Sequence, residues 1–202
     1  MATMKEYSLV LSGTKILFSM PDGNCRDLPE PQGKITPIFN IYDQEKYEDI
    51  EIAPYFSLAS RSFCFGSFLD PRLGSLQLNL LIRETTDKTT NLFKNDFAAG
   101  IIDDHNKSYE SFNSRASIGI YAPKTFTSVR YNEQEWLYYE VDLQNKPYPC
   151  YSFVISDKHY LTFGFRYNDF RGQNEPWYKM AKQLEQSIMS SVRIDLSPGA
   201  SS

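Results

Sequence analysis

Apolar residues near the end of the chain recur every three or four positions, which is the spacing of an amphipathic helix. The residues that share this stripe are Trp177, Met180, Ala181, Leu184, Ile188, Met189 and Val192. Asn174 is a candidate N-cap, and Pro176 suits the first helical turn, where its missing N–H costs nothing. The pattern predicts a helix over about 175–192, whose outer side carries Lys179, Lys182, Gln183 and Gln186.

A strand pattern with a period of two precedes this helix, and we expect this strand to have one buried face. The alternating residues are, on one side, Leu161, Phe163, Phe165 and Tyr167 and, on the other, Tyr160, Thr162, Gly164 and Arg166. Further strands are predicted at 7–11, 15–20, 38–41, 50–52, 62–68, 76–82, 126–131, 135–143 and 148–155. Because a helix that follows a hairpin buries its stripe on that sheet, we expect an α+β fold: an antiparallel sheet with helices packed on it.

A second helix is predicted over about 90–107, with Thr89 or Thr90 as its cap. Its apolar face consists of Leu92, Phe93, Phe97, Ala98, Ile101 and Ile102. Asp103, Asp104 and His105 near its end fit a solvated helix terminus better than a metal or acid–base cluster. The order of elements predicts a single domain over 1–196, followed by a disordered tail at 197–202.

The chain has 202 residues, of which 41% are hydrophobic and 23% charged, the balance of a globular protein. No window approaches about 18 consecutive apolar residues, so we expect no membrane span. Aromatic residues are over-represented, with 14 Tyr, 14 Phe and 2 Trp. Tyrosine suits positions with one wet and one dry side, so a half-exposed sheet, or less readily an interface, explains the excess.

The three cysteines, Cys25, Cys64 and Cys150, are widely spaced and form no C-x-x-C pair. We therefore expect no disulfide framework, no metal centre and no cofactor. The N-terminus shows neither the charged segment nor the long apolar segment of a signal peptide. This favours a cytoplasmic protein, or a periplasmic one if an export signal has been removed.

Motifs of the common enzyme classes are missing from the sequence: there is no G-x-S-x-G, no H-E-x-x-H and no phosphate-binding glycine loop. The one tempting pair is Cys150 with His159. If residues 156–157 form a hairpin turn, His159 lies opposite Val154, and Cys150 is four residues, or roughly 13 Å, further along. A nucleophile and its base need about 3 Å. We therefore expect a binding protein without catalytic residues, with an enzyme as the lesser alternative.

Acidic residues cluster in two stretches that also carry aromatic residues. In the first, five acids surround Lys46, and in the second no basic residue lies between Asn132 and Asn145. If both stretches lie on the same side of the sheet, they form an acidic face with aromatic anchors, suited to a basic protein and not to nucleic acid. The alternative is a solvated loop and an outward strand face. The candidate partner-binding residues are Tyr42, Asp43, Glu45, Tyr47, Glu48, Asp49, Glu51, Glu133, Glu135, Trp136, Tyr138 and Glu140.

The two ends of the chain resemble a known fold family. At the start, a strand, a glycine turn and a second strand over residues 7–22 end in Phe-Ser-Met-Pro-Asp. The close combines Glu135-Trp136-Leu137 with the strand 159–163 and a helix that contains Trp177 and runs into Ile194. This pattern is similar to the PsbP-like and DcrB-like α/β/α sandwiches.

The resemblance implies a non-enzymatic protein-binding module. The leading interpretation is a bacterial immunity protein that binds and neutralises a cognate toxin in type VI or contact-dependent interbacterial competition. The alternative is a secretion chaperone or adaptor, like the DcrB-like adaptors, that binds apolar segments of an effector. The expected partner is a toxin or effector with a basic surface, and the oligomeric state is left open.

Overall fold

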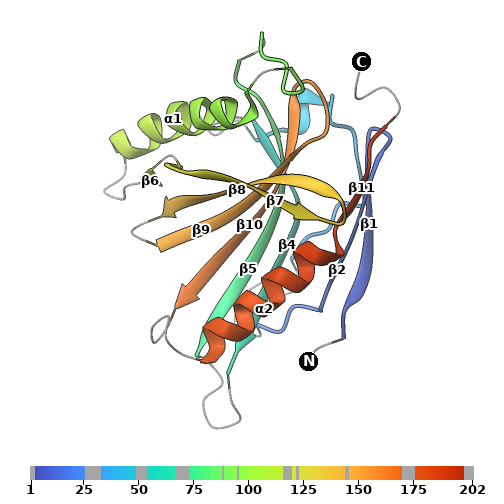
Figure 1. The fold of residues 1–202 in the computed structure, drawn as a ribbon, viewed down its shortest axis with the longest axis vertical. Helices are drawn as coiled ribbons and strands as arrows, with labels where there is room; N and C mark the ends of the chain where they lie inside the picture. The colour runs from blue at the N-terminus through green and yellow to red at the C-terminus, as the bar shows by residue number, and fades with distance from the viewer. Residues whose placement is uncertain are drawn as a thin grey trace.

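The fold is that of a computed structural model, which describes residues 3–25, 33–48, 54–66, 73–87, 89–94, 96–115, 120–121, 123–143, 146–169 and 176–197. This part of the chain forms two β-sheets and two α-helices, as Figure 1 shows. The predicted α+β class is confirmed. The predicted strand 50–52 lies outside the described residues, as do candidate residues Asp49 and Glu51.

The large sheet has the strand order β4-β5-β10-β9-β8-β6, and β7 also pairs with β8. All of its strand pairs are antiparallel, as the sequence predicts. Its strands are β4 (Tyr55–Phe65), β5 (Gly74–Glu84), β6 (Ile120–Tyr121), β7 (Phe126–Tyr131), β8 (Gln134–Leu143), β9 (Lys146–Val154) and β10 (His159–Asp169).

The small sheet has the order β11-β2-β1-β3 and contains the predicted opening hairpin. Its strands are β1 (Lys5–Leu11), β2 (Thr14–Met20), β3 (Ile38–Phe39) and β11 (Arg193–Asp195), and β1 pairs with β3 in parallel. The hairpin closes through Ser12 and Gly13, both at positive φ, because a two-residue turn that follows the strand twist needs this geometry. Alternate residues of β1 and β2 are buried, so this sheet has one core face.

Helix α2 (Pro176–Ser191) confirms the prediction of a helix over about 175–192. It crosses the front of the large sheet beside β2 (Figure 1). Trp177, Ala181 and Ile188 are buried as expected, but Met180 is exposed and Glu185 takes a buried place in the stripe. The stripe runs through positions 177, 181, 185 and 188, so the expectation for Met180 is wrong by a fraction of a helical turn. The candidate cap Asn174 lies outside the described residues.

The first helix, α1 (Phe97–Arg115), begins and ends later than the predicted 90–107. Asp96 is its cap, because its carboxylate accepts the N–H groups of Ala98 and Ala99 at 3.0 and 3.3 Å. Thr89 and Thr90 instead bond to the carboxylate of Asp87 within a turn. Such local side-chain bonds compete with helix formation. Among the described residues, neither helix is long and apolar enough to cross a membrane.

Strand β10 is buried on both faces, so the prediction of a single buried face is wrong. Leu161 and Phe163 pack in the core formed with α2 and the small sheet. Tyr160, on the opposite face, packs in a second core with Ile101 of α1. The large sheet is therefore a middle layer, with α1 on one side and α2 plus the small sheet on the other. The finer expectation of a PsbP-like sandwich stays a prediction.

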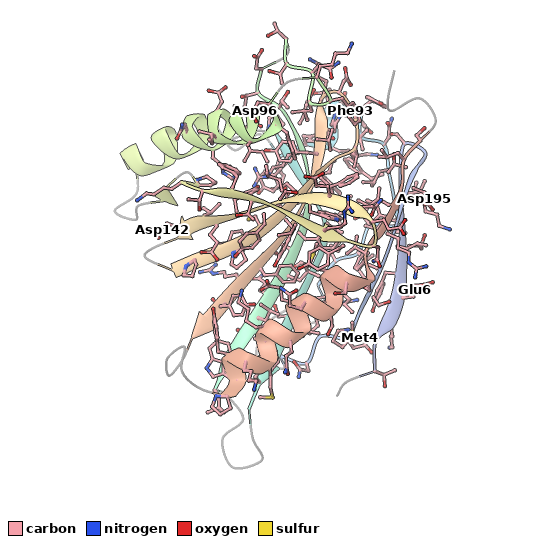
Figure 2. All side chains as sticks on the ribbon, viewed as in Figure 1. Met4, Glu6, Phe93, Asp96, Asp142 and Asp195 are labelled. Carbon is pink, nitrogen blue, oxygen red and sulfur yellow. A yellow bond between two sulfur atoms is a disulfide. The ribbon has the colours of Figure 1, made fainter. Side chains whose placement is uncertain are left out.

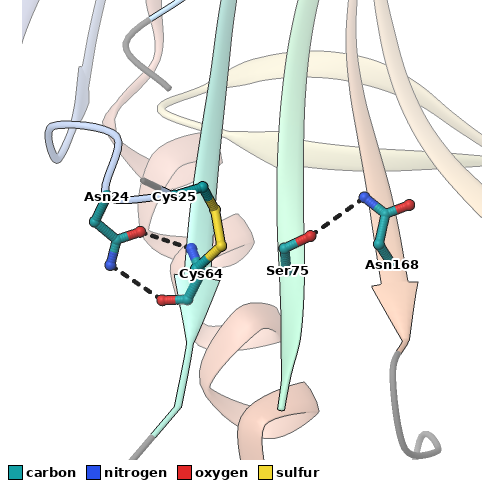
Figure 3. Close-up of a disulfide and its surroundings, with 5 residues drawn as sticks. All are labelled: Asn24, Cys25, Cys64, Ser75 and Asn168. Atoms are coloured by element: carbon teal, nitrogen blue, oxygen red, sulfur yellow. Dashed lines mark hydrogen bonds between the residues drawn. A yellow bond between two sulfur atoms is a disulfide. The ribbon is translucent and has the colours of Figure 1, made fainter. Parts of the chain in front are cut away.

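A strap formed by residues 24–25 and 33–36 runs along the outer edge of β4, and Figure 3 shows its Asn24 and Cys25 beside Cys64 of β4. The side-chain amide of Asn24 accepts the N–H of Cys64 at 2.6 Å and donates to its carbonyl oxygen at 3.0 Å. Next to it, Cys25 and Cys64 form a disulfide with a Cα–Cα distance of 5.0 Å. The expectation of no disulfide is wrong, because these cysteines are 39 residues apart and meet only through the strap.

The edge of β4 is closed further along by backbone bonds. The N–H of Ser60 donates to the carbonyl oxygen of Lys34, and the N–H of Thr36 donates to that of Leu58. Gly33 lies so close to β4 that a Cβ atom there would be 2.0 Å from the carbonyl oxygen of Ser60. Pairing of this kind covers an edge that would otherwise be open to other strands.

Candidate protein-binding surface

The first acidic stretch forms a well-anchored loop over residues 40–48, here named the acidic loop. The side chain of Asn40 accepts the hydroxyl of Ser12 at 2.9 Å and the backbone N–H of Tyr42 at 3.1 Å. Ser12 in turn accepts the N–H of Ile41 at 3.0 Å. These bonds fasten the loop to the hairpin turn of the small sheet.

Tyr47 supports the acidic loop from inside rather than standing on its surface. Its ring is buried edge-on against Phe39, with centroids 5.8 Å apart, and its hydroxyl donates to the carbonyl oxygen of Ile41 at 2.8 Å. Burial raises the pKa of the Tyr47 phenol, and the carboxylate of Glu84 adds to the effect. Tyr47 is thus a core residue, although the sequence proposed it as a contact residue.

The outer side of the acidic loop carries one exposed aromatic residue and several charges. Tyr42 is 61% exposed, and its ring rests edge-on against His159 with centroids 5.5 Å apart. Asp43 pairs with Lys46 at 3.0 Å, Glu45 is exposed, and Glu48 accepts the hydroxyl of Tyr55 at 2.8 Å. The loop therefore presents Tyr42 beside carboxylates on a fixed backbone.

Several other loops meet the acidic loop at the same end of the large sheet, the upper end in Figures 1 and 2. The N–H of Glu48 donates to the carbonyl oxygen of Tyr55, where β4 begins, and β10 begins with His159 opposite Glu84 of β5. The segment 89–94 joins them, since the N–H of Leu92 donates to Asp157 at 2.8 Å. We name this surface, made of residues 40–48, 84–87, 89–94 and 155–159, the loop end.

The second acidic stretch does not form one face with the first. Successive residues of β8 point to opposite sides of the sheet, so Glu135 lies on the α1 side while Tyr138 and Glu140 lie on the α2 side. Tyr138 pairs with Tyr151, whose partner on β10 is four residues from the loop end, roughly 13 Å away. Glu135, near the start of β8, lies beside the loop end, because it lines a pocket together with Phe93.

Two further candidate residues of the second acidic stretch, Trp136 and Glu133, lie in the core and in a turn. Trp136 is fully buried, 5.1 Å from the ring of Phe153, so it is a core residue and not an exposed anchor. Glu133 lies in the two-residue turn between β7 and β8 at φ 66°. In the same turn, Asn132 donates to the carbonyl oxygens of Ser190 and Val192, both at 2.7 Å. The turn therefore clamps the end of α2.

A buried carboxylate on α2 was not predicted from the sequence. Glu185 has no exposed surface and accepts the hydroxyls of Tyr151, at 2.7 Å, and of Tyr167. Lys182, one turn earlier on α2, lies 3.3 Å from the same carboxylate and 4.9 Å from the centre of the Tyr167 ring. Burial, and then the Glu185 charge, raises the pKa of both phenols. In the sequence, the burial of Glu185 is indicated only by its position within the apolar stripe through residues 177, 181 and 188.

More tyrosines surround this cluster, and they explain much of the tyrosine excess. Tyr131 donates to the side chain of Gln186 at 2.9 Å, and Tyr138 donates to Glu140. The ring of Tyr138 lies 5.0 Å from that of Tyr151. Tyr131 and Tyr138 are half-buried, and each hydroxyl has a polar partner, as expected of a half-exposed sheet.

Asp104 and His105 are buried against the other face of the sheet, so the expectation of a solvated helix end is wrong. The helix continues to Arg115, which places both residues inside it. Asp104 accepts the N–H and hydroxyl of Thr86 at 3.0 and 2.7 Å and the hydroxyl of Tyr160 at 3.1 Å. Burial raises the pKa of Asp104 and lowers the pKa of His105 to about 3.

Cys150 and His159 do not form a catalytic pair. Tyr160, and not His159, lies opposite Val154, because the β9–β10 turn is one residue longer than expected. Cys150 pairs with Gly164, five residues from His159, so the two side chains point to opposite faces. Burial raises the pKa of the Cys150 thiol to about 12. Among the described residues, no group of three or more His, Cys, Asp or Glu could hold a metal ion.

A pocket of about 330 Å³ opens beside the loop end, here named the Glu135 pocket. Its walls include Phe93, Phe97, Leu137, Val154 and Leu196, with the carboxylate of Glu135 among them. The hydroxyl of Ser128 donates to this carboxylate. A second hollow, of about 420 Å³, lies between the β7–β8 turn and β11 and includes Glu133.

No model of a known protein family matches the chain, and no curated protein matches it significantly.

Proposed function

We propose that this chain is a non-enzymatic protein-binding module that uses the loop end to bind a protein with a basic surface. The observation that carries the proposal is Tyr42, which is 61% exposed on a loop fixed by the Ser12 and Asn40 bonds. A tyrosine held in one conformation contributes contact area at little entropic cost, and tyrosine is enriched among dominant interface residues. Carboxylates of Asp43 and Glu45 beside it supply a charged rim.

Charge at the loop end favours a basic partner. The described residues of the loop end carry more acids than bases: Asp43, Glu45, Glu48, Glu84, Asp87 and Asp157 against Lys46, Lys94 and Lys158. A surface with an excess of one charge speeds association with a surface of the other sign, and an acidic excess repels nucleic-acid phosphates. We therefore propose a protein partner and not a nucleic acid.

The specific role that we propose is that of a bacterial immunity protein, which neutralises a cognate toxin by covering a basic functional surface. The resemblance of both chain ends to PsbP-like and DcrB-like proteins supports this role. The size of the Glu135 pocket supports it too, since about 330 Å³ suits one side chain of a folded partner rather than a whole helix.

A second candidate is a secretion chaperone or adaptor that binds apolar effector segments. The observation that favours it is a small apolar patch on the outer face of the small sheet. There Val10 and Ile38 are neighbours in register, and Ile38 is 76% exposed. Such a patch offers a docking point for an apolar segment.

We further propose that the protein works in an oxidising compartment such as the periplasm. The Cys25–Cys64 disulfide supports this, because disulfides are rare where glutathione and thioredoxin keep thiols reduced. Alkylation of free thiols in separated periplasmic and cytoplasmic extracts tests it. One alkylated cysteine, Cys150, is expected after denaturation of the periplasmic protein. Three alkylated cysteines in the native compartment would remove the proposal.

The binding proposal is tested with the protein encoded by the adjacent gene as candidate toxin. Co-expression should restore growth, and calorimetry should give a complex whose affinity falls with salt. Tyr42→Ala should weaken binding by about 2 kcal/mol, roughly thirtyfold, and Glu45→Lys should slow association. Glu6→Lys, on the exposed face of β1, is the matched control.

Two outcomes distinguish an error in the proposed binding surface from an error in the proposed immunity role. If Tyr42→Ala and Glu45→Lys bind the toxin like the parent, the loop end is not the binding surface. If the parent gives no growth rescue and no complex, whereas an adjacent membrane-helix effector binds and an Ile38→Asp variant loses it, the chaperone role replaces the immunity role.

A further inference from the structure

The Glu135 pocket lies beside the first residues of β8, which pair with β7 but have no partner on β9. Pairing of β8 with β9 starts at Leu137 opposite Ser152, whereas β7 pairs with β8 from Gln134 to Tyr139. Residues 134–136 of β8 therefore pair with β7 alone, and in this part the β7–β8 hairpin separates from β9. Phe93, from the segment before α1, and Phe97, the first residue of α1, form another wall of the pocket.

The pocket combines apolar walls with one carboxylate. Among the described residues that line it, Glu135 is the only charged one. The Ser128 hydroxyl donates to Glu135 and so orients it. Arg130, its cross-strand neighbour on β7, makes no ion pair with Glu135 in the described part of the chain. The carboxylate is therefore open to a cation, while an anion would be repelled and would find no charged partner.

The aromatic walls narrow the kind of cation. A guanidinium group is planar, stacks on aromatic rings and bonds a carboxylate through two parallel N–H donors. An ammonium group is a more strongly hydrated point charge and gains less from such walls. The chemistry of two phenylalanine rings beside one carboxylate thus fits arginine better than lysine.

The pocket adjoins the loop end. Phe93 is 40% exposed and follows Leu92, which is bonded to the β9–β10 turn at Asp157. Figure 2 shows Phe93 at the upper end of the molecule, where the loops meet. We propose that the Glu135 pocket is the anchor site for one arginine side chain of the protein partner, an inference that rests on the proposed protein-binding function.

The test uses the full chain and small probes, so that it does not depend on a toxin. Backbone amide resonances are followed by NMR during titration with n-butylguanidinium, n-butylammonium, n-butanol and pentanoate. The parent should bind butylguanidinium in the millimolar range, with shifts at Phe93, Leu137 and Val154. Butanol, butylammonium and pentanoate should bind more weakly, in line with the pocket's charge and walls.

Three variants assign the binding to named groups. Glu135→Gln should weaken butylguanidinium binding about tenfold while leaving butanol binding unchanged. Glu140→Gln, on the same strand but the opposite face, should bind like the parent. Phe93→Ala should weaken butylguanidinium more than butylammonium, and thermal melts confirm that each variant is folded.

The inference is overturned if Glu135→Gln binds butylguanidinium as the parent does, if butanol or pentanoate binds the parent as tightly, or if no resonance near the pocket shifts. Toxin binding is a separate readout. If the probes bind as expected but no basic protein does, the pocket stands and the proposed function fails. If a toxin binds with equal affinity to the parent and to Glu135→Gln, the proposed function stands and the arginine anchor fails.

Discussion

Replacing His105 with glutamine should remove a large part of the acid sensitivity of the fold. His105 is 4% exposed, and its ring lies edge-on to Tyr139 with centroids 5.7 Å apart. Burial, and then the charge of Arg83, lowers the pKa of His105 to about 3. In the unfolded chain the imidazole has its ordinary pKa of about 6.5. Between these values the unfolded state binds a proton that the folded state does not.

The sign and size of the effect follow from this difference. Stability from the neutral imidazole is fully present above pH 6.5 and is lost as the pH falls towards 3. Between pH 7 and pH 5 the loss is about 2 kcal/mol, and it reaches about 4 kcal/mol by pH 3. Asp104 acts in the opposite direction, since its raised pKa lets the folded state take up a proton first. His159, whose pKa is also lowered by burial, adds to the loss.

Urea unfolding at pH 7, 6 and 5 measures the effect as a free energy of unfolding. The parent should lose about 2 kcal/mol more over this range than His105→Gln and His105→Leu. Asp104 and His159 are present in all three proteins, so their contributions cancel in the comparison. Equal pH dependence of the parent and both variants would show that His105 has the same pKa in the folded and unfolded states and that the burial argument is wrong.

Three further predictions concern stability. Reduction of the disulfide, or Cys64→Ser, should lower the unfolding free energy in guanidinium by about 4 kcal/mol, because the link closes a loop between residues 39 positions apart; unchanged stability after complete reduction would contradict this. Glu185→Gln should cost about 3 kcal/mol in urea unfolding, whereas Lys182→Met, at a half-exposed side chain, should cost about 1, and the reverse order would count against a buried anchor. Gly164→Ala should lower the melting temperature, because its methyl group would lie 2.2 Å from a tyrosine hydroxyl, while Gly100→Ala, with 3.7 Å of room, should raise it.

The sequence predicts elements well where one side of a segment is apolar over several turns or residues. The stripe through Trp177, Ala181 and Ile188 located α2, and the alternation of β1 and β2 located the opening hairpin. The same reasoning misplaced α1 by several residues at both ends. Its start depends on Asp87 and Asp96, whose carboxylates bind nearby N–H and hydroxyl groups, and such local competition has no period to detect.

The candidate surface was predictable only in part. A cluster of acids around Tyr42 marks an exposed loop, and the structure places it at one end of the sheet. The expectation that this loop forms one face with Tyr138 and Glu140 depended on the strand register of β8, which the sequence does not determine. A shift of one residue along β8 exchanges the two faces, so Glu135 and Trp136, neighbours in the chain, lie in a pocket wall and in the core.

Glu185 shows why the remaining features required the structure. A glutamate on a helix normally lies in solvent, since burying a carboxylate without partners is costly. Here the partners are the phenols of Tyr151 and Tyr167, which are 34 and 18 residues away in the chain. The side chain can be buried only because two different strands present hydroxyls to the same point, so its place depends on the assembled sheet. The disulfide depends on assembly in the same way, since Cys25 reaches Cys64 only after the strap has paired with β4. Contacts between such distant residues form only in the completed fold. The stability of a variant that lacks one of them therefore tests how sheet, helix and strap are arranged.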